Sequence, residues 1–383
     1  MSKEDGDARS ISCTQCDWMM EVPPETPEEL IRNDCPNCSS PTNFNGQIEK
    51  TDGLGFDFLP PEIELEEIGL LEYGVNPKVS DLDKKTISGF VNRWSPMILS
   101  VQVMADMMKS NIELYGEEVL GRFTETSISY RKALRQIETR HKIPRGSRLS
   151  DGFPDGGEKS IRRFARTYMG ADPSKGSFTE GSGLGQEMGL VTLHYEKDGD
   201  DESLKLKLTE IGSEALKIKL HREPSLEIES HRAAGAGEVT LPRWMDEKDI
   251  SRIFQIIAAR SNAEYLWIKF LLQRIDASVR GLTISDLVGT EIERELTEGK
   301  IKRWFERGSD IDMVTNMNNE NVSREEMEKR LEKKIIATIP GTLSRMKELS
   351  LIFQFKRARQ TFYKATKSGR KWVANWDRDS RIE

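Results

Sequence analysis

The sequence predicts a mainly α-helical protein with small two-stranded β hairpins, preceded by a small metal-bound module at the N-terminus. Three observations support this fold class. The four cysteines form two closely spaced pairs within the first 38 residues. Apolar residues then recur every three or four positions over several long stretches, which is the period of an amphipathic helix. Two short strand pairs, each followed by Thr-x-x-Gly, lie 157 residues apart in the chain.

The cysteines are Cys13, Cys16, Cys35 and Cys38, arranged as two CxxC pairs separated by eighteen residues. Two such pairs offer zinc a tetrahedral set of four thiolates, and a site filled by four thiolates has no open position for water. We therefore expect one structural Zn ion. Two disulfides, an iron site on the same sulfurs and a redox CxxC are the alternatives. The pattern resembles the zinc ribbons at the ends of many transcription and replication proteins, and we assign residues 1–42 to this module.

The charge of the chain is unevenly distributed. There are 57 basic and 64 acidic residues, a net charge of -7, which excludes a uniformly basic coat for nucleic acid. Residues 1–80 hold 5 basic and 17 acidic side chains, and the segment 43–95 is predicted to be an acidic linker or tether. Two islands are positive: residues 121–170 hold 12 basic and 5 acidic side chains, and residues 341–383 hold 11 and 4. These islands are either local DNA surfaces or solvated faces.

Residues 96–221 are predicted to form a first block, module A. The apolar period from Met97 to Val119 predicts one long amphipathic helix. An Asp-Gly pair at 198–199, between two apolar runs, is a strong signal for a hairpin turn. The remaining elements are expected as helices over 126–142, 158–169 and 178–189, strands over 190–195 and 203–208, and a helix that begins at residue 208.

Residues 222–243 are predicted to be a linker, and residues 244–383 to form a second block, module B. This block is expected to hold a helix over about 247–278 and an exposed polar insertion over 308–323. It ends with a helix that carries Leu343, Met346 and Leu349, strands over 351–355 and 360–365, and Thr366-Lys367-Ser368-Gly369. Because module A carries Thr209-x-x-Gly212 at the corresponding place, the two blocks look like an internal repeat.

A helix pair, a two-stranded hairpin and a closing helix, in this order, resemble the winged-helix family. A zinc ribbon followed by two such domains resembles the DNA-binding modules of archaeal transcription factors. The resemblance implies that the second helix of the motif lies in the major groove and that basic residues of the hairpin contact phosphates. In module B the residues expected to contact DNA are Thr342, Ser344, Arg345, Lys347, Lys356, Arg357, Arg359, Lys367 and Arg370.

Module A departs from this pattern. Its candidate recognition segment, 178–188, contains Glu180 and Glu187 but no Lys or Arg, and its hairpin turn is acidic. Because acidic side chains repel phosphate, we expect this module to bind a protein partner or a second subunit. Possible contacts of module A with a DNA backbone are Arg131, Lys132, Arg135, Arg162, Arg163 and Arg166.

No catalytic residue is predicted. A nuclease that holds magnesium through Asp155 and Glu158 is the enzymatic alternative. We expect a DNA-binding transcription regulator or general-transcription-type factor that contacts double-stranded DNA. The alternative is a winged-helix scaffold subunit of a replication, chromosome-organising or defence complex with little DNA contact. No stretch approaches the ~18 consecutive apolar residues of a membrane helix, so we expect a cytoplasmic, nucleoid-associated protein without membrane contact.

Overall fold

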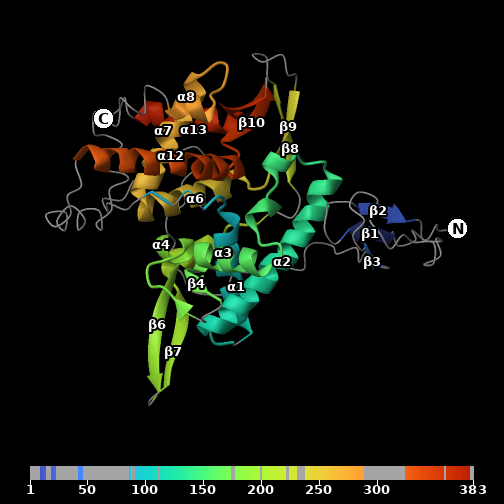
Figure 1. Ribbon diagram of the computed structural model, residues 1–383, viewed down its shortest axis with the longest axis vertical. Helices are drawn as coiled ribbons and strands as arrows, with labels where there is room; N and C mark the ends of the chain where they lie inside the picture. The colour runs from blue at the N-terminus through green and yellow to red at the C-terminus, as the bar shows by residue number, and fades with distance from the viewer. Residues whose placement is uncertain are drawn as a thin grey trace. The chain divides into compact units, whose positions relative to one another are not determined.

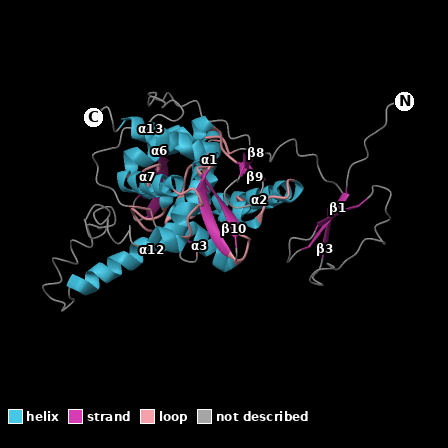
Figure 2. Cartoon of the chain, turned by 90° about the horizontal axis from the view of Figure 1, so that it is seen from above, coloured by secondary structure: helices cyan, strands magenta, loops and turns pink. Residues whose placement is uncertain are grey.

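The computed structural model of the chain contains two compact units, Met1–Asp57 and Phe58–Glu383. It describes residues 9–13, 19–22, 42–45, 86–87, 89, 91–110, 112–173, 177–198, 201–220, 224–230, 238–288, 324–357 and 359–379. The second unit is mainly helical and its strands are paired as small antiparallel hairpins (Figure 1 and Figure 2), which confirms the predicted fold class at this level. In the described ranges no helix has the length and apolar character needed to span a membrane.

The first unit contains a three-stranded antiparallel sheet. Strand β1 (Arg9–Cys13) is central, with β2 (Met19–Val22) and β3 (Thr42–Asn45) on either side. Cys13, the last residue of β1, pairs with Thr42, the first residue of β3. The other three predicted zinc ligands, Cys16, Cys35 and Cys38, and most of the predicted linker 43–95 lie outside the described residues.

Module A begins with two helices, as predicted, but the break between them lies earlier in the chain than expected. Helix α1 (Ser95–Lys109) starts with Pro96 in its first turn, and α2 (Gly116–Arg140) follows after a break. Between them the chain is extended and joins a strand, since Leu206 N donates to Leu114 O at 2.8 Å and Tyr115 bridges to Lys205. The prediction of one helix from Met97 to Val119 is wrong, because the apolar period runs unbroken through a segment that pairs with a strand.

The rest of module A follows the predicted order. Helix α3 (Glu158–Met169) has the predicted bounds and ends at Gly170, whose φ of 69° is left-handed. The short helix expected over 178–189 is confined to one turn. The further elements are η2 (Arg145–Ser147), η3 (Ser150–Gly152), β4 (Ala171–Asp172), β5 (Ser177–Phe178), α4 (Leu184–Glu187), β6 (Val191–Asp198), β7 (Asp201–Leu208) and α5 (Glu210–Ala215).

The segment 222–243 is not a plain linker. It contains an antiparallel hairpin of β8 (Ser225–Ser230) and β9 (Glu238–Arg243). The helix predicted over 247–278 is likewise two helices, α6 (Glu247–Arg260) and α7 (Asn262–Ala277), which meet at Ser261 with φ -149° and ψ 68°. No Gly or Pro lies at this break to signal the end of a helix. The apolar period therefore predicted one helix instead of two.

Module B ends with the predicted helix and hairpin. Its remaining elements are α8 (Ile284–Val288), α12 (Arg324–Glu348), β10 (Ile352–Arg357), β11 (Gln360–Ala365) and α13 (Lys367–Asp379). Leu282, between α7 and α8, bridges to Tyr363 of β11, as Tyr115 bridges to β7 in module A. The predicted insertion 308–323 lies outside the described residues.

The predicted internal repeat is confirmed by matching hydrogen bonds after the two hairpins. The hydroxyl of Thr209 accepts the N–H of Gly212 at 3.0 Å, and that of Thr366 accepts the N–H of Gly369 at 2.9 Å. Each threonine therefore caps the helix that follows its hairpin. A Cβ at either glycine would overlap a carbonyl oxygen at the base of the hairpin, so the close approach requires glycine at both places.

The turn before each hairpin also repeats. Gly189 and Ser350 occupy it with φ of 63° and 53°, and the hydroxyls of the two capping threonines donate to their carbonyls, both at 2.6 Å. The next residues, Leu190 and Leu351, each donate an N–H to the carbonyl five residues earlier, at 2.9 and 3.0 Å. The hairpins of both modules are thus held at their base by the same bonds.

Aromatic side chains pack between the helices of module B and within its hairpin. Phe254 of α6 lies 4.6 Å from Trp372 of α13, measured between ring centroids, and both tryptophans of α13, Trp372 and Trp376, are fully buried. On the hairpin itself, Phe355 stacks on Phe362 at 5.5 Å. Burying such large side chains contributes several kcal/mol in total, about 1.5–3 for each. The exposed residues of the hairpin, among those the structure describes, are Lys356, Arg357, Arg359 and Gln360, which lie at its tip.

Candidate functional site

The tip of the β10–β11 hairpin carries three exposed basic residues. Lys356 and Arg357 end β10, opposite Thr361 and Gln360, and Arg359 lies in the turn with φ 68°. No hydrogen bond or ion pair of these three side chains is present within the described part of the chain. The tip thus presents three exposed positive charges, in the turn where the sequence places them.

Two further predicted DNA contacts lie on α13. Lys367 and Arg370 are both exposed in the first turn of this helix. Arg370 Nη1 donates to Ala365 O at 3.0 Å, so its guanidinium is partly committed to the end of β11. The structure therefore places these residues on the surface just after β11, at the end of the hairpin opposite its tip.

Arg345 and Thr342 are not surface residues, and the prediction that they contact DNA is wrong in this structure. Both side chains are fully buried, with 0% exposure. The guanidinium of Arg345 forms an ion pair with Glu264 of α7 at 2.7 Å, and also donates to Val91 O and, at 2.9 Å, to the Thr342 hydroxyl. This face of α12 packs into the core, so it does not offer a reading helix to a groove.

Ser344 and Lys347, on the same helix, also serve internal contacts. Arg93 donates to the Ser344 hydroxyl at 2.9 Å and to its carbonyl at 3.1 Å. Lys347 Nζ donates to Gly146 O at 2.9 Å and to Gln354 Oε1 at 2.8 Å. Burial, aided by the nearby positive charge of Arg93, lowers the pKa of Lys347 to about 8. Lys347 therefore links the η2 turn to strand β10 by hydrogen bonds, and its ammonium group is not available to bind a phosphate.

Glu348 is a structural residue that the sequence analysis missed. Its carboxylate accepts the N–H of Trp94 at 2.5 Å, the N–H of Ser95 at 2.8 Å and the Ser95 hydroxyl. It thereby caps α1 from a helix 253 residues away in the chain. Burial raises the pKa of Glu348, while Arg93 and these hydrogen bonds lower it. The Ser-Pro pair at 95–96 is a sequence signal for the start of a helix, but no local signal indicates that Glu348 caps it.

Most of the arginines predicted as backbone contacts in module A are paired with acidic residues. The ion pairs are Arg131 with Asp155 at 3.9 Å, Arg135 with Asp151 at 3.3 Å, Arg162 with Asp172 at 3.2 Å, and Arg166 with Asp172. Lys132 and Arg163 are exposed. Four of the five arginines predicted as backbone contacts are therefore committed to ion pairs within the protein.

Asp155, one of the two residues of the alternative nuclease site, forms a hydrogen bond within its own loop. Its carboxylate accepts the N–H of Gly157 at 3.0 Å, and this bond is the largest cause that lowers its pKa. Glu158 is exposed in the first turn of α3. Among the described residues there is no group of three or more His, Cys, Asp or Glu side chains placed to hold a metal ion.

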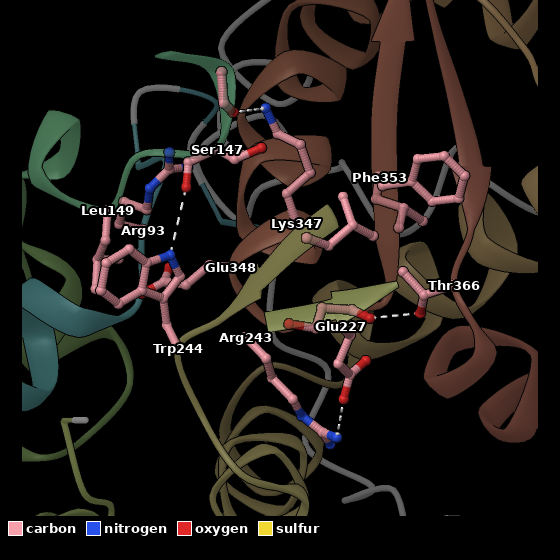
Figure 3. Close-up of a pocket in the computed structure, with 14 residues that line it drawn as sticks. Arg93, Ser147, Leu149, Glu227, Arg243, Trp244, Lys347, Glu348, Phe353 and Thr366 are labelled. Carbon is pink, nitrogen blue, oxygen red and sulfur yellow. Dashed lines mark hydrogen bonds and ion pairs between the residues drawn. The ribbon is translucent and has the colours of Figure 1, made fainter. Parts of the chain in front are cut away.

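A small pocket lies where the η2 turn, the β8–β9 hairpin and the end of α12 meet (Figure 3). Its lining includes Arg93, Lys347 and Glu348, together with Arg243, which pairs with Glu227 at 2.7 Å. Its volume of about 30 Å³ has room for one or two water molecules. In the figure, Trp244 points to Ser147 and donates to its carbonyl at 3.4 Å. The pocket is therefore a junction between elements and too small for a substrate.

Comparison of the chain with protein-family models, with curated proteins and with solved structures gave no match.

Proposed function

We propose that the protein binds double-stranded DNA through its phosphates, with the tip of the β10–β11 hairpin as the primary contact. One observation carries the proposal: Lys356, Arg357 and Arg359 are exposed together at the tip, and no partner neutralises them in the described part of the chain. Residues 349–376 contain seven basic and no acidic side chains, so the local field is positive although the whole chain is acidic. Such a field attracts phosphate.

The order of elements supports a winged-helix assignment for module B. Helix α7 is followed by a short extended segment at Leu282 that pairs with β11, and then by α8, α12 and the hairpin, which would be the wing. Because Arg345 and Thr342 are buried, we assign the contact to the wing rather than to α12. Contacts of this kind position a protein on the duplex without reading many bases.

The N-terminal unit is proposed to be a zinc ribbon. Cys13 pairs with Thr42, so the chain leaves β1 and enters β3 at the same end of the sheet. Cys16 follows β1 by three residues and Cys38 precedes β3 by four, which favours one site for both cysteine pairs. We expect one Zn per chain by elemental analysis of the purified protein, and its loss in Cys35→Ser/Cys38→Ser. Protein that retains zinc in this variant would contradict the assignment.

A transcription role, as a regulator or a general-transcription-type factor, is the proposed context for this DNA binding. A scaffold role for module A is the second candidate, and its hairpin supports it. The β6–β7 hairpin carries Tyr195, which is 51% exposed, and the residues of its turn are predominantly acidic. This surface suits a protein partner or a second copy of the chain, and it would repel phosphate.

The test is fluorescence anisotropy of a labelled duplex with wild type and Lys356→Ala/Arg357→Ala/Arg359→Ala. The matched control is Lys207→Ala/Lys219→Ala/Lys248→Ala, which removes the same charge from exposed positions on β7, after α5 and on α6. We expect the hairpin variant to lose most of its affinity at about 50 mM salt while the control keeps it. Equal losses in the two variants would contradict the proposal, and absence of binding by wild type would favour the scaffold role.

A further inference from the structure

We propose that the DNA surface is composite: the loop of residues 141–149, here called the η2 loop, joins the tip of the β10–β11 hairpin to form one phosphate-binding surface for duplex DNA. The inference rests on the proposed function and extends it to the other module. The η2 loop belongs to the positive island 121–170, and the hairpin to the island 341–383. The fold thus brings together parts of two charge islands that are about 200 residues apart in the chain.

Direct contacts join the two segments. Lys347 Nζ binds both Gly146 O of the loop and Gln354 Oε1 of β10. A Cβ at Gly146 would overlap the Gln354 side chain, so the loop backbone lies directly against this side chain of β10. Gln354 and Lys356 are two residues apart in β10 and face the same side, about 7 Å from each other along the strand. Arg145, next to Gly146, is therefore close to the basic tip.

The loop is held in this position from two other directions. Arg93 Nη2 donates to Arg148 O at 3.0 Å, and Trp244 Nε1 donates to Ser147 O at 3.4 Å. These donors come from the segment before α1 and from the residue after β9. A surface loop that is fixed by three separate elements presents its charges in a defined place, which lowers the entropy lost on binding.

The η2 loop has two exposed positive charges that can bind a phosphate. Lys142 and Arg145 are both exposed, and neither side chain has an ion pair or hydrogen bond to another described residue. Residues 139–150 contain four basic and no acidic side chains. Lys142 and Arg145 differ in this respect from the arginines of α2 and α3 that pair with aspartates. With the three residues of the hairpin tip, the composite surface has five exposed positive charges.

Backbone conformation gives a second, independent indication. The described residues include three non-glycine residues with positive φ: Lys142 at 52°, Ser350 at 53° and Arg359 at 68°. Glycine is the favoured residue in this region, and other residues there destabilise the fold. Lys142 follows α2 at a position where helices commonly have glycine, and Arg359 lies in a hairpin turn. Both halves of the composite surface thus carry a charge at a position where glycine would be more stable, as is typical of functional sites.

The experiment replaces these basic residues with the residue that the backbone prefers. Lys142→Gly and Arg359→Gly, singly and together, are compared with Ser350→Gly, a control that relieves the same conformation at a buried position without changing the charge. Melting temperature is measured beside affinity for a labelled duplex at about 50 and 200 mM salt. We expect every variant to be at least as stable as wild type, because the left-handed conformation suits glycine.

The ratio of Kd at 200 mM to Kd at 50 mM salt should fall about 3.5-fold in each basic variant and about 12-fold in the double variant, the loss expected for one and two phosphate contacts. Ser350→Gly should keep the wild-type ratio, and Lys142→Arg should restore it. An effect of Arg359→Gly without one of Lys142→Gly would overturn the composite surface and leave the hairpin proposal standing. A wild type that does not bind duplex would overturn both.

Discussion

The ion pair between Arg345 and Glu264 lies where water does not reach, since both side chains are 0% exposed. A charge in such a place is stable only when partners compensate its lost hydration. Arg345 donates to the Glu264 carboxylate, to a backbone carbonyl and to a hydroxyl, while Glu264 also accepts the N–H of Ile87 at 2.9 Å. The pair therefore joins α7, α12 and the segment before α1.

We expect Arg345→Met to lower the free energy of unfolding by about 3–5 kcal/mol, because it leaves the buried Glu264 carboxylate without its counter-ion. Arg345→Met/Glu264→Gln should recover part of this loss, since the remaining buried group is then neutral. Urea denaturation of the two variants and wild type measures both effects. Unchanged stability together with weaker DNA binding would show instead that Arg345 is a DNA contact, as its residue type and position on a helix first suggested.

The sequence identified the exposed charges at the residue scale but not the buried ones. Lys356, Arg357 and Arg359 lie in a turn between two apolar strands, so their exposure follows from local pattern. Arg345 lies three residues from both Thr342 and Glu348 on one helix, and its burial depends on Glu264, 81 residues away. No local pattern shows which face of a polar helix a distant carboxylate will cover.

At the scale of elements, the contact between the η2 turn and strand β10 depends on Lys347. The pKa of this lysine is lowered to about 8 by burial, whereas an exposed lysine in the unfolded chain has a pKa near 10.4. Between these two values the unfolded chain binds more protons than the folded one, so the free energy of unfolding increases as pH rises. Well below pH 8 the lysine is protonated in both states, so the free energy of unfolding no longer changes with pH through this group.

We therefore expect the stability of wild type relative to Lys347→Met to increase by about 2 kcal/mol between pH 8 and pH 10. Urea denaturation at several pH values across this range measures it. The control is Lys356→Met, which removes an exposed lysine from the neighbouring strand. Parallel pH profiles of wild type and Lys347→Met would contradict the buried position of the Lys347 ammonium.

Elements were predicted best where a local signal marks their ends. Gly170 ends α3 at the predicted residue, and Thr366 marks the end of β11 in the same way. The break between α1 and α2 carried no such signal, because the apolar period continues through an extended segment that pairs with β7. The hairpin β8–β9 was taken for a linker, since charged and small residues interrupt its few apolar positions. Tertiary pairing decided these elements rather than local preference.

On the scale of the whole molecule, charge is separated rather than balanced. The chain has a net charge of -7, the N-terminal 80 residues hold 17 acidic side chains, and the hairpin turn of module A is acidic. The corresponding hairpin of module B is basic, and the fold places the η2 loop of module A beside it. Two hairpins with the same bonds at their base therefore carry opposite charge, which is the basis for proposing phosphate as the ligand of one and a protein as the partner of the other.

The most direct test of this account is the salt dependence of duplex binding by the full-length protein. The logarithm of the association constant, plotted against the logarithm of the salt concentration, has a slope of about -0.9 for each phosphate contact. We predict that Lys356→Ala/Arg357→Ala/Arg359→Ala reduces the size of the wild-type slope by about 2.7. If the variant keeps the wild-type slope, the β10–β11 tip does not contact DNA phosphates, and the central claim is wrong.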